Sequence, residues 1–494
     1  MKTELQHFFE EKTLTSLILI ALIVRLLAAI FSKGFGMFDD HFLAIEVAQR
    51  WADGYNDWFN RGIPAGHSII YPGLHYLLFK FLDAMSLTDP QDKMLIVRLI
   101  HAVYSTLTVA FAYKTTEILS GKSAAKTVGL IIGLFWVFPF MSVRNLIEFV
   151  CIPPLMISFY YIAKNEKEKT YLNTLLAGVF MGFSFMFRYQ ILLILGGVGL
   201  VFLFRKEVTN AFLYGIGFLI SAFLTQGVVD WIAWGYPFAA IYAYFDYNLH
   251  HSQNYPSGFL GLYTLLLLGV FIPPTSFLYA WGYFKSFKKY VILAFPALIF
   301  LIFHSIFPNQ QERFVLPATP LFIISGVIGF QELQKKYQFI SRDSKILKAA
   351  HIWFWTINII LLFAFTFHYS KKSRVETVYY FHNKPDVHAI IFDHARQPPI
   401  FYMDKWVEYY RVENSEDWHK LKTKIQNKEI IKPNYAVFLG QKNIEERVKT
   451  MNEVLNVKTE IEKEIEPSFL DNILYRLNPK RNRNRTSYIY KIDW

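Results

Sequence analysis

Two adjacent aspartates and a histidine, Asp39, Asp40 and His41, follow a long apolar run within a few residues. A carboxylate in such a place can act as a general base, taking the proton from a hydroxyl while the hydroxyl oxygen attacks. The neighbouring carboxylate can raise its pKa or bind a sugar hydroxyl. The same residues also suit a helix cap or a solvated loop, so their types and spacing leave both interpretations open.

Three arginines stand singly at the ends of apolar runs: Arg144, Arg188 and Arg313. The arginine fork matches the oxygens of a phosphate, so each could hold an anionic leaving group. Glu148, one helical turn after Arg144, could orient it. Anchoring at a membrane interface is an equally good explanation for Arg144 and Arg188.

Two further stretches add candidate binding residues. The aromatic stretch 229–258 carries Asp230 and Asn248, a composition that suits a membrane interface or a carbohydrate. Its two adjacent histidines lack a third residue at a metal-binding spacing, so we predict no metal site there. In the stretch 303–321, His304, Glu312 and Arg313 lie so close to apolar sequence that we expect them to pair internally.

Arg25 differs from these residues because it lies in the middle of the first apolar run. An arginine at mid-membrane depth costs about 2.5 to 3.5 kcal/mol on insertion scales and is a functional candidate by default. A structural partner on a neighbouring helix would explain it equally well.

The composition indicates the kind of element that must position these residues. The 494-residue chain is 53% hydrophobic and only 18% charged, which is unusual for a soluble protein. Its net charge of +12 comes largely from lysines between apolar runs, so we assign it to membrane orientation and predict no nucleic-acid partner. The single cysteine, Cys151, excludes a disulfide within the chain.

Apolar runs of bilayer-spanning length predict about eleven transmembrane helices. We place them at 14–32, 95–119, 127–142, 146–163, 171–187, 190–204, 210–228, 258–284, 290–304, 315–332 and 350–368. Residues 67–83 are apolar but short and broken by Pro72 and Gly73, which favours an interfacial or re-entrant segment. We read the first run as a retained helix, because no cleavage site follows it.

Lysine-rich loops at 121–126, 164–169, 205–207, 285–289 and 334–348 predict the cytoplasmic side, with the N-terminus there too. The candidate site residues all fall on the opposite side. Residues 1–369 then form the transmembrane catalytic domain, with a first outer loop at 33–94. Residues 370–494 form a small soluble α/β domain on the outer side, with strands expected at "DVHAIIFD", "PIFYM", "WVEYYRV", "YAVFLG" and "TSYIYKIDW" and a helix at "EERVKTMNEVLN".

Four motifs, in this order, resemble those of the Alg9-like and GPI mannosyltransferases: "DDHF" (39–42), "HSIIYPGL" (67–74), "VDWIAWGYPF…YNLHH" (229–251) and "HSIFPNQQERFVLPATPL" (304–321). His67 stands where that family has Arg, and Asp40 where it has Glu. Asn309, Gln310 and Gln311 stand where it has His, Lys and Glu. The likeness covers residues 14 to 330. It implies a GT-C-like, all-α polytopic fold, to which the C-terminal α/β domain is added.

The resemblance implies an inverting sugar transfer from a polyprenyl-phosphate donor, most simply mannose, to a lipid-linked or cell-envelope glycan. Asp39 would be the base, with Asp40 beside it. Arg313 and His304, with Arg144 or Arg188, would hold the departing phosphate. No cofactor is implied: a divalent metal is possible but not required. His41, Asp230, Asn248 and Glu312 complete the expected donor site. The outer domain suggests a bacterial inner membrane protein with an extracytoplasmic site, or a lumenal site in the endoplasmic reticulum of a eukaryote.

Two other classes of function remain as alternatives. Another sugar, such as glucose or aminoarabinose, could be transferred to lipid or protein. A lipid or sugar transporter is the second alternative, and Arg25 favours it. Transporters, however, place their polar sites near mid-membrane on broken helices within repeats, and here the polar groups gather on one side without a visible repeat.

Overall fold

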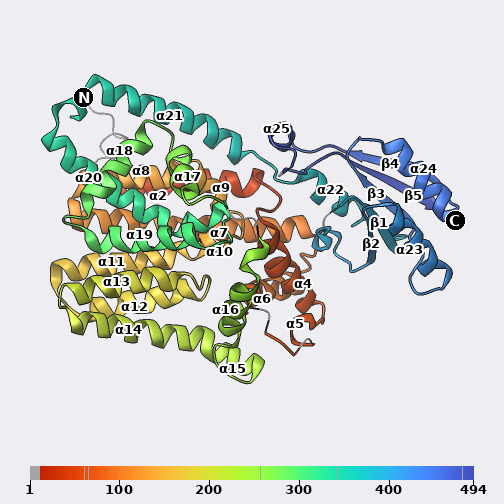
Figure 1. Ribbon diagram of the computed structural model, residues 1–494, viewed down its shortest axis with the longest axis horizontal. Coiled ribbons are helices and arrows are strands. Elements are labelled where there is room, and N and C mark those ends of the chain that lie inside the picture. The colour runs from red at the N-terminus through yellow and green to blue at the C-terminus, as the bar shows by residue number, and fades with distance from the viewer. Residues whose placement is uncertain are drawn as a thin grey trace. The chain divides into compact units, whose positions relative to one another are not determined.

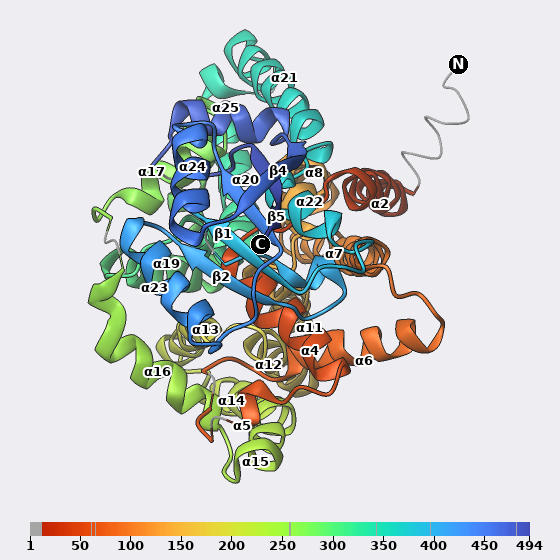
Figure 2. The same ribbon diagram turned by 90° about the vertical axis from the view of Figure 1, so that its right-hand side faces the viewer.

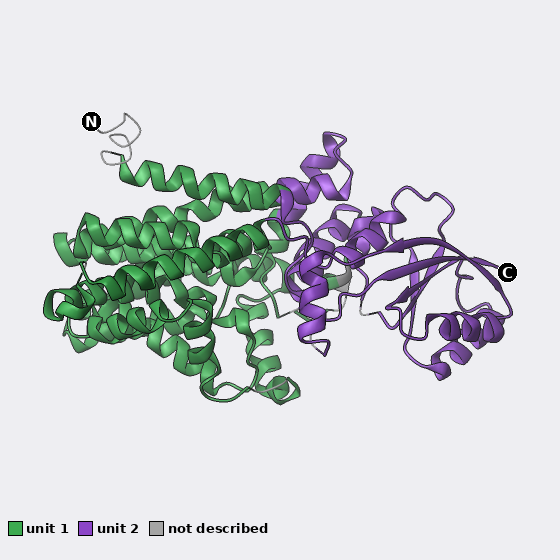
Figure 3. Cartoon of the chain, turned by 90° about the horizontal axis from the view of Figure 1, so that it is seen from above, with its two compact units in different colours: residues 1–30, 54–74, 98–366 green, residues 31–53, 75–97, 367–494 purple. Residues whose placement is uncertain are grey.

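The computed structural model describes residues 12–60, 62–64, 66–255, 258–341, 343–395, 397–480 and 482–494 (Figure 1). The predicted cytoplasmic N-terminal segment before residue 12 lies outside the described residues. The chain divides into two compact units, shown in Figure 3. Unit 1 comprises residues 1–30, 54–74 and 98–366, and unit 2 comprises residues 31–53, 75–97 and 367–494.

Unit 1 is built from helices. Its first part contains α2 (Thr13–Phe31), α5 (Asp57–Asn60), α8 (Lys122–Leu134), α9 (Val137–Ser142), α10 (Ile147–Val150), α11 (Ile152–Glu168), α12 (Tyr171–Phe185) and α13 (Ile191–Phe204). Its second part contains α14 (Val208–Ala222), η2 (Phe223–Gly227), α15 (Val228–Trp234), α16 (Ala239–His251), η3 (Ser252–Asn254), α17 (Leu262–Val270), α18 (Thr275–Ser286), α19 (Val291–Ile306), η4 (Glu312–Ala318), α20 (Thr319–Lys336), η5 (Gln338–Ile340) and α21 (Lys345–Thr366). Helices α6 (Ile70–Ala84) and α7 (Pro90–Ser120) contribute residues to both units.

Many of these helices suit a bilayer. Six are long and apolar enough to cross it: Thr13–Phe31, Pro90–Ser120, Ile147–Glu168, Val208–Trp234, Glu312–Lys336 and Gln338–Thr366. A seventh span results if α18 and α19, which meet at a bend of 117°, are taken together. Tyr171–Phe185 and Ile191–Phe204 are shorter apolar helices. The predicted class, a polytopic helical membrane protein with a small C-terminal sheet domain, is confirmed.

Two of the predicted spans are interrupted. The run 127–142 breaks after Leu134, where Asn358 of α21 accepts from the Trp136 backbone N–H at 2.9 Å and donates to the Leu134 carbonyl at 2.9 Å. This side chain therefore satisfies the backbone groups that the break exposes. The run 258–284 breaks between α17 and α18 at Pro273 and Pro274, because proline has no N–H to continue a helix.

Glycines let pairs of helices approach closely in unit 1. A Cβ on Gly178 of α12 would overlap the Tyr214 carbonyl of α14, and a Cβ on Gly217 would overlap the Leu175 carbonyl. Gly282 of α18 meets Gly329 of α20 in the same manner. Small residues at such crossings are the usual device for packing helices in lipid, where burial of apolar side chains gives little driving force.

Unit 2 has a five-stranded sheet in the order β2-β1-β3-β5-β4. Its strands are labelled in Figure 1, and Figure 2 shows the same sheet from another side. Strands β1 (Ala389–Asp393), β2 (Glu408–Val412) and β3 (Tyr435–Leu439) are parallel, whereas β5 (Ser487–Asp493) is antiparallel to β3 and to β4 (Lys458–Ile465). Its helices are α3 (Phe38–Asp40), α4 (Val47–Ala52), α22 (Lys372–Tyr380), α23 (Ser415–Gln426), α24 (Ile444–Leu455) and α25 (Phe469–Leu477), with a π-helical turn η1 (His41–Glu46) and a 3-10 turn η6 (Ile400–Met403).

Both faces of this sheet are covered, which explains its two apolar clusters. Ile391 packs with Trp418, Leu421 and Met451 of α23 and α24. Its neighbour Ile390 points to the opposite face and packs in a second cluster with Phe381 and others. Alternation along a strand sends successive side chains to opposite faces, so a sheet covered on both sides needs continuous apolar strands.

The expected strands are confirmed at β1, β2, β3 and β5, and the expected helix at α24. The strand predicted at "PIFYM" is wrong, because this stretch forms η6 directly after Pro398 and Pro399, which cannot donate to a ladder. Strand β4 was not expected, since "KTEIEKEI" is too rich in charge to resemble a buried strand. Its largely exposed position at the sheet edge fits that composition.

Candidate active site

Three charged side chains from three separate helix ends meet inside unit 1. Arg188 Nη1 lies 2.8 Å from Glu148 Oε1, and Arg313 Nε lies 3.3 Å from the same oxygen. Glu148 belongs to α10, Arg188 to the turn between α12 and α13, and Arg313 to η4 before α20. All three are buried. The expectation that Arg313 is paired internally is therefore confirmed, and its carboxylate is Glu148 rather than the exposed Glu312.

In this cluster, Glu148–Arg188–Arg313, two guanidinium groups contact the same carboxylate oxygen. Both Arg188, at 4.7 Å, and Arg313, at 5.7 Å, lie over the ring of Phe314. Within the described part of the chain, Arg188 Nε and Nη2 have no hydrogen-bond acceptor. A buried donor without a partner costs free energy, so these groups favour an anionic ligand with several oxygens.

His304, in the last turn of α19, lies beside the same ring. Its ring centroid is 6.0 Å from that of Phe314, and its Nδ1 is 2.8 Å from the Phe300 carbonyl. That carbonyl can only accept, so Nδ1 carries the proton and Nε2 is an acceptor in the neutral ring. Nε2 has no hydrogen-bond partner among the described residues. It would become a donor to an anion if the ring took up a second proton.

Aromatic residues hold the turn that carries Arg188. Tyr71, from the "HSIIYPGL" motif, packs edge-on against Phe187 at 5.8 Å, and its hydroxyl lies 2.9 Å from His101 Nε2. The Tyr263 hydroxyl donates to the Gln311 carbonyl at 3.1 Å, next to η4. Segments far apart in the sequence thus meet at this end of the helices.

Other predicted donor-site residues have local roles. Asp230 accepts from Gln226 Nε2 at 2.8 Å and from the Ala240 N–H at 2.9 Å, so both its oxygens fix the connection of α15 to α16. Asn248 donates to the Tyr244 carbonyl one turn earlier, at 2.8 Å. Arg144 is buried in the turn after α9, with its guanidinium 4.6 Å from the Phe140 ring.

Asp39, Asp40 and His41 belong to unit 2. Asp39 is exposed and Asp40 is buried, and both lie in the short helix α3. His41 is buried between two aromatic rings, stacked on Phe35 at 4.6 Å and on Tyr402 at 5.4 Å. Burial, together with the positive charges of Lys371 and Arg374, lowers the pKa of His41 from 6.5 to about 3. The ring is therefore neutral at ordinary pH.

Glu46 lies one turn further along and is the second buried ionisable group of this region. Its Oε1 accepts from the Phe401 N–H at 3.2 Å and lies 3.9 Å from His41 Nε2. Burial raises the pKa of Glu46 to about 8, although two backbone hydrogen bonds oppose the shift. No pattern around Glu46 predicted a role for this carboxyl, which stands among apolar residues in "FLAIEVA".

Arg25 is satisfied by its own unit. Nε donates to Ser105 Oγ at 3.0 Å, Nη1 to the carbonyls of Ala21 and Gly133, and Nη2 to that of Ile132. Of the two explanations open for Arg25, these contacts support the structural one.

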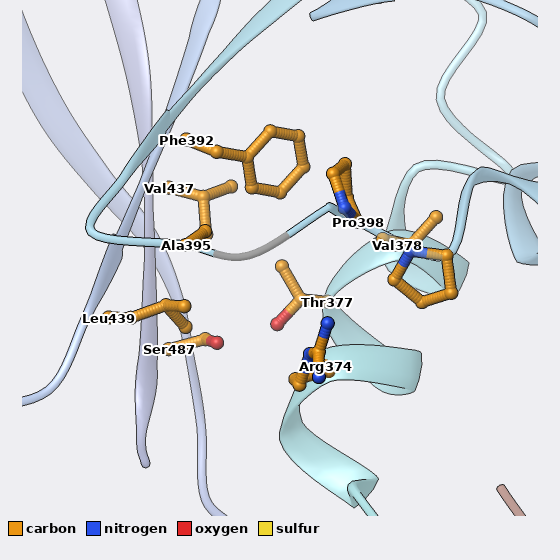
Figure 4. Close-up of a pocket in the computed structure, with 10 residues that line it drawn as sticks. Arg374, Thr377, Val378, Phe392, Ala395, Pro398, Val437, Leu439 and Ser487 are labelled. Carbon is orange, nitrogen blue, oxygen red and sulfur yellow. The ribbon is translucent and has the colours of Figure 1, made fainter. Parts of the chain in front are cut away.

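A small cavity lies in unit 2 between α22 and the sheet (Figure 4). Its polar groups are Arg374, Thr377 and Ser487, and apolar residues such as Phe392 and Val437 line the rest. Only about 20 Å³ is available to the centres of water molecules, which is room for about one water and not for a sugar. Among the described residues, no group of three His, Cys, Asp or Glu side chains could hold a metal ion.

Comparison with known proteins assigns the chain to a family. The profile of the Alg9-like mannosyltransferase family matches residues 16–406. The chain belongs to this family. GPI mannosyltransferase 3 of Yarrowia lipolytica is 21% identical over 403 residues, covering 79% of this chain and 74% of the relative. The enzyme of the same name from Debaryomyces hansenii is 22% identical over 411 residues, covering 79% and 72%. This Alg9-like protein is therefore a membrane glycosyltransferase.

Solved structures of other glycosyltransferases show the same fold. ArnT from Cupriavidus metallidurans, bound to undecaprenyl phosphate, matches with a TM-score of 0.64 at 10% identity, covering 96% of this chain and 97% of that one. The oligosaccharyltransferase AglB from Archaeoglobus fulgidus, in complex with an inhibitory peptide and dolichol-phosphate, matches with a TM-score of 0.51 at 12% identity, covering 87% and 70%. The predicted GT-C-like fold is confirmed.

Proposed function

We propose that this family member transfers mannose from a polyprenyl-phosphate donor to a hydroxyl of a lipid-linked or cell-envelope glycan. Three observations support the donor class: the family, the buried Arg188 nitrogens that have no acceptor in the described part of the chain, and the undecaprenyl phosphate and dolichol-phosphate in the two solved structures. Arg188 carries the proposal, because a lipid monophosphate supplies the oxygens that its Nε and Nη2 require.

The reaction proceeds with inversion at the sugar. Asp39 takes the proton of the acceptor hydroxyl as its oxygen attacks C1, and the bond from C1 to the phosphate oxygen breaks. Arg188 and Arg313 stabilise the polyprenyl phosphate that leaves, with His304 and Arg144 as further candidates. Asp39 follows the last residue of α2 by eight residues, so the chain lets it lie at most about 28 Å from the end of that span. Asp40, His41, Asp230, Asn248 and Glu312 support the site indirectly in this proposal.

The arginines supply the positive charge at the leaving group, so the transfer needs no divalent metal. Treating the purified enzyme with EDTA is then expected to leave its rate unchanged. A loss of rate that only Mg²⁺ or Mn²⁺ restores would overturn this part of the proposal.

We place the site and the C-terminal domain on the extracytoplasmic face of a bacterial inner membrane. The lysine-rich loops support this orientation through the positive-inside rule. Cysteines introduced at Lys424 of α23 and at Lys167 of α11 test it in intact cells. A membrane-impermeant maleimide is expected to label the first and not the second, and the opposite pattern would reverse the orientation.

Substitution of the base tests the chemistry. The Asp39→Asn variant is expected to lose activity by at least about 100-fold, since a general base contributes about 10² to 10⁴. Asp493→Asn, an exposed aspartate at the end of β5, is the control and should keep wild-type activity. Because Asp39 is exposed, its replacement should leave the unfolding temperature unchanged. Near wild-type transfer by Asp39→Asn would exclude it as the base.

Donor identity needs a separate experiment. The purified protein is incubated with polyprenyl-phosphate mannose, glucose or aminoarabinose and with membrane extract, and labelled product is measured. The proposal predicts transfer from the mannose donor. Transfer from one of the other two donors alone would replace mannose, and use of nucleotide sugars alone would overturn the donor class.

A further inference from the structure

Helix α25 (Phe469–Leu477) in unit 2 exposes an apolar stripe. Phe469 is 80% exposed, Leu477 is 77% exposed and Ile473 is 36% exposed. The three residues are spaced four apart, so they lie along one face of the helix. A contiguous exposed apolar face on a folded domain marks an interaction surface.

Polar contacts fix the opposite face of α25 to the rest of unit 2, so the apolar stripe faces away from the domain. Asp471 is buried and accepts from Asn484 Nδ2 at 3.0 Å, while Ser468 Oγ caps the helix through the Asp471 N–H at 3.3 Å. His368 Nε2 lies 3.8 Å from Asp471 Oδ1. The stripe therefore cannot turn inward without breaking this polar anchor.

Basic residues accompany the stripe. Arg476 lies beside it on the helix, and Lys480 and Arg483 follow the helix, all three exposed. The sequence between Asn472 and Lys491 contains no acidic residue and further arginines at 481 and 485. An apolar face combined with a local excess of positive charge is the pattern of a segment that lies in the headgroup layer of an anionic membrane.

The contacts of α25 connect it to the ends of two spans. Ser468 Oγ lies 3.3 Å from His368 Nδ1, and His368 follows Thr366, the last residue of α21, by two positions. Ser32, directly after the last residue of α2, donates to the His368 carbonyl at 3.0 Å. A residue two positions beyond a span can lie at most about 7 Å from its end. The anchor of α25 is thus tied, through Ser32 and His368, to the segments that directly follow α2 and α21 in the chain.

We propose that α25 binds the leaflet surface itself. Phe469, Ile473 and Leu477 enter the boundary between headgroups and acyl chains, and Arg476, Lys480 and Arg483 contact the phosphates of anionic lipids. The anchoring contacts to His368 and the positive charge of the segment that follows the helix both favour lipid over a soluble protein partner as the occupant. The proposal stands independently of the sugar that the enzyme transfers.

The buried position of Cys151 makes a direct test possible in the full-length protein, since an introduced exposed cysteine is labelled selectively. An environment-sensitive fluorophore is attached at Ile473→Cys, and in the control at Lys424→Cys on the exposed side of α23. Both proteins are placed in nanodiscs of phosphatidylcholine with about 30% phosphatidylglycerol. A fraction of the lipids carries a fluorescence quencher near the headgroup.

The label at residue 473 is expected to be quenched at least about twofold more strongly than the label at residue 424. Replacing the anionic lipid by phosphatidylcholine, or combining Arg476→Gln, Lys480→Gln and Arg483→Gln, should reduce that difference. Equal quenching at both sites overturns the proposal. So does a label at residue 473 that is shielded from water but not quenched by lipid, because a protein partner then covers the stripe.

Discussion

Two buried arginines of unit 1, Arg25 and Arg188, show how the same side chain serves different ends. Arg25 donates to one hydroxyl and three carbonyl groups, and all these acceptors belong to its own unit. Arg188 shares a single carboxylate with Arg313 and leaves two nitrogen atoms without acceptors in the described part of the chain. All three guanidinium nitrogens of Arg25 are used within the protein, whereas Arg188 keeps two nitrogens that can bind an anionic ligand.

Burial alone does not identify a functional site. Both arginines carry a large desolvation cost, which the protein itself offsets for Arg25. For Arg188 the offset is only partial, because two of its nitrogen atoms have no acceptor in the described part of the chain. An anionic ligand would supply those acceptors.

The largest effect is expected from Arg188→Gln, which should reduce sugar transfer by about 10² to 10³, the usual loss when one donor to developing negative charge is removed. Stability should change less than activity, because Arg313 stays in contact with Glu148. Activity and thermal unfolding are measured on the same detergent-purified protein. Arg205→Gln, which breaks a part-exposed pair with Glu166, is the control and should keep full activity. A similar loss in both variants would contradict a specific role for Arg188.

Removal of the shared carboxylate tests whether the two arginines of the cluster bind an anion. Glu148→Gln removes the carboxylate that both buried guanidinium groups contact, and the free energy of unfolding should fall by about 3 to 5 kcal/mol. Undecaprenyl phosphate should then raise the unfolding temperature more in this variant than in the wild type. An equal shift in both proteins would show that the lipid phosphate does not bind at the cluster.

Arg25→Gln should affect stability rather than chemistry. The shorter amide leaves carbonyl groups unsatisfied inside the helices, which should lower the free energy of unfolding by about 1 to 3 kcal/mol. The kcat of the folded fraction should equal that of the wild type. A tenfold lower kcat with unchanged stability would contradict the structural role of Arg25 and make it a functional candidate again.

The smallest effect concerns His41 and Glu46 in unit 2. Since the pKa of His41 is lowered to about 3, the unfolded chain binds a proton that the folded chain refuses, and stability falls as pH drops from 6.5 towards 3. The pKa of Glu46 is raised to about 8, so its contribution is present below pH 4.5 and is lost as pH rises through 8. His41→Phe, which keeps the stacking, should flatten only the acid side of a plot of unfolding temperature against pH. Glu46→Gln should flatten only the alkaline side, and unchanged plots would contradict both shifts.

Local pattern was sufficient for much of the fold. The length and apolarity of the runs predicted membrane helices, and apolar runs such as "DVHAIIFD" and "YAVFLG" predicted the C-terminal sheet. Local pattern was insufficient where a distant residue or a proline decided the structure. Asn358 lies far from the break at Leu134 that it satisfies, and the apolar stretch after Pro398 and Pro399 becomes a 3-10 turn.

The amino-acid sequence alone was enough to predict a membrane enzyme with a family signature and a set of isolated charged residues at helix ends. Which of those charges meet became known only from the packing of the helices. Glu148, Arg188 and Arg313 are brought to one place by the packing of α10, η4 and the turn after α12, whereas Arg25 and Asp230 are satisfied within their surroundings. The stability and ligand affinity of a buried charged group depend on all the groups that contact it. Those groups come from segments far apart in the sequence, and the sequence pattern does not show that they are in contact.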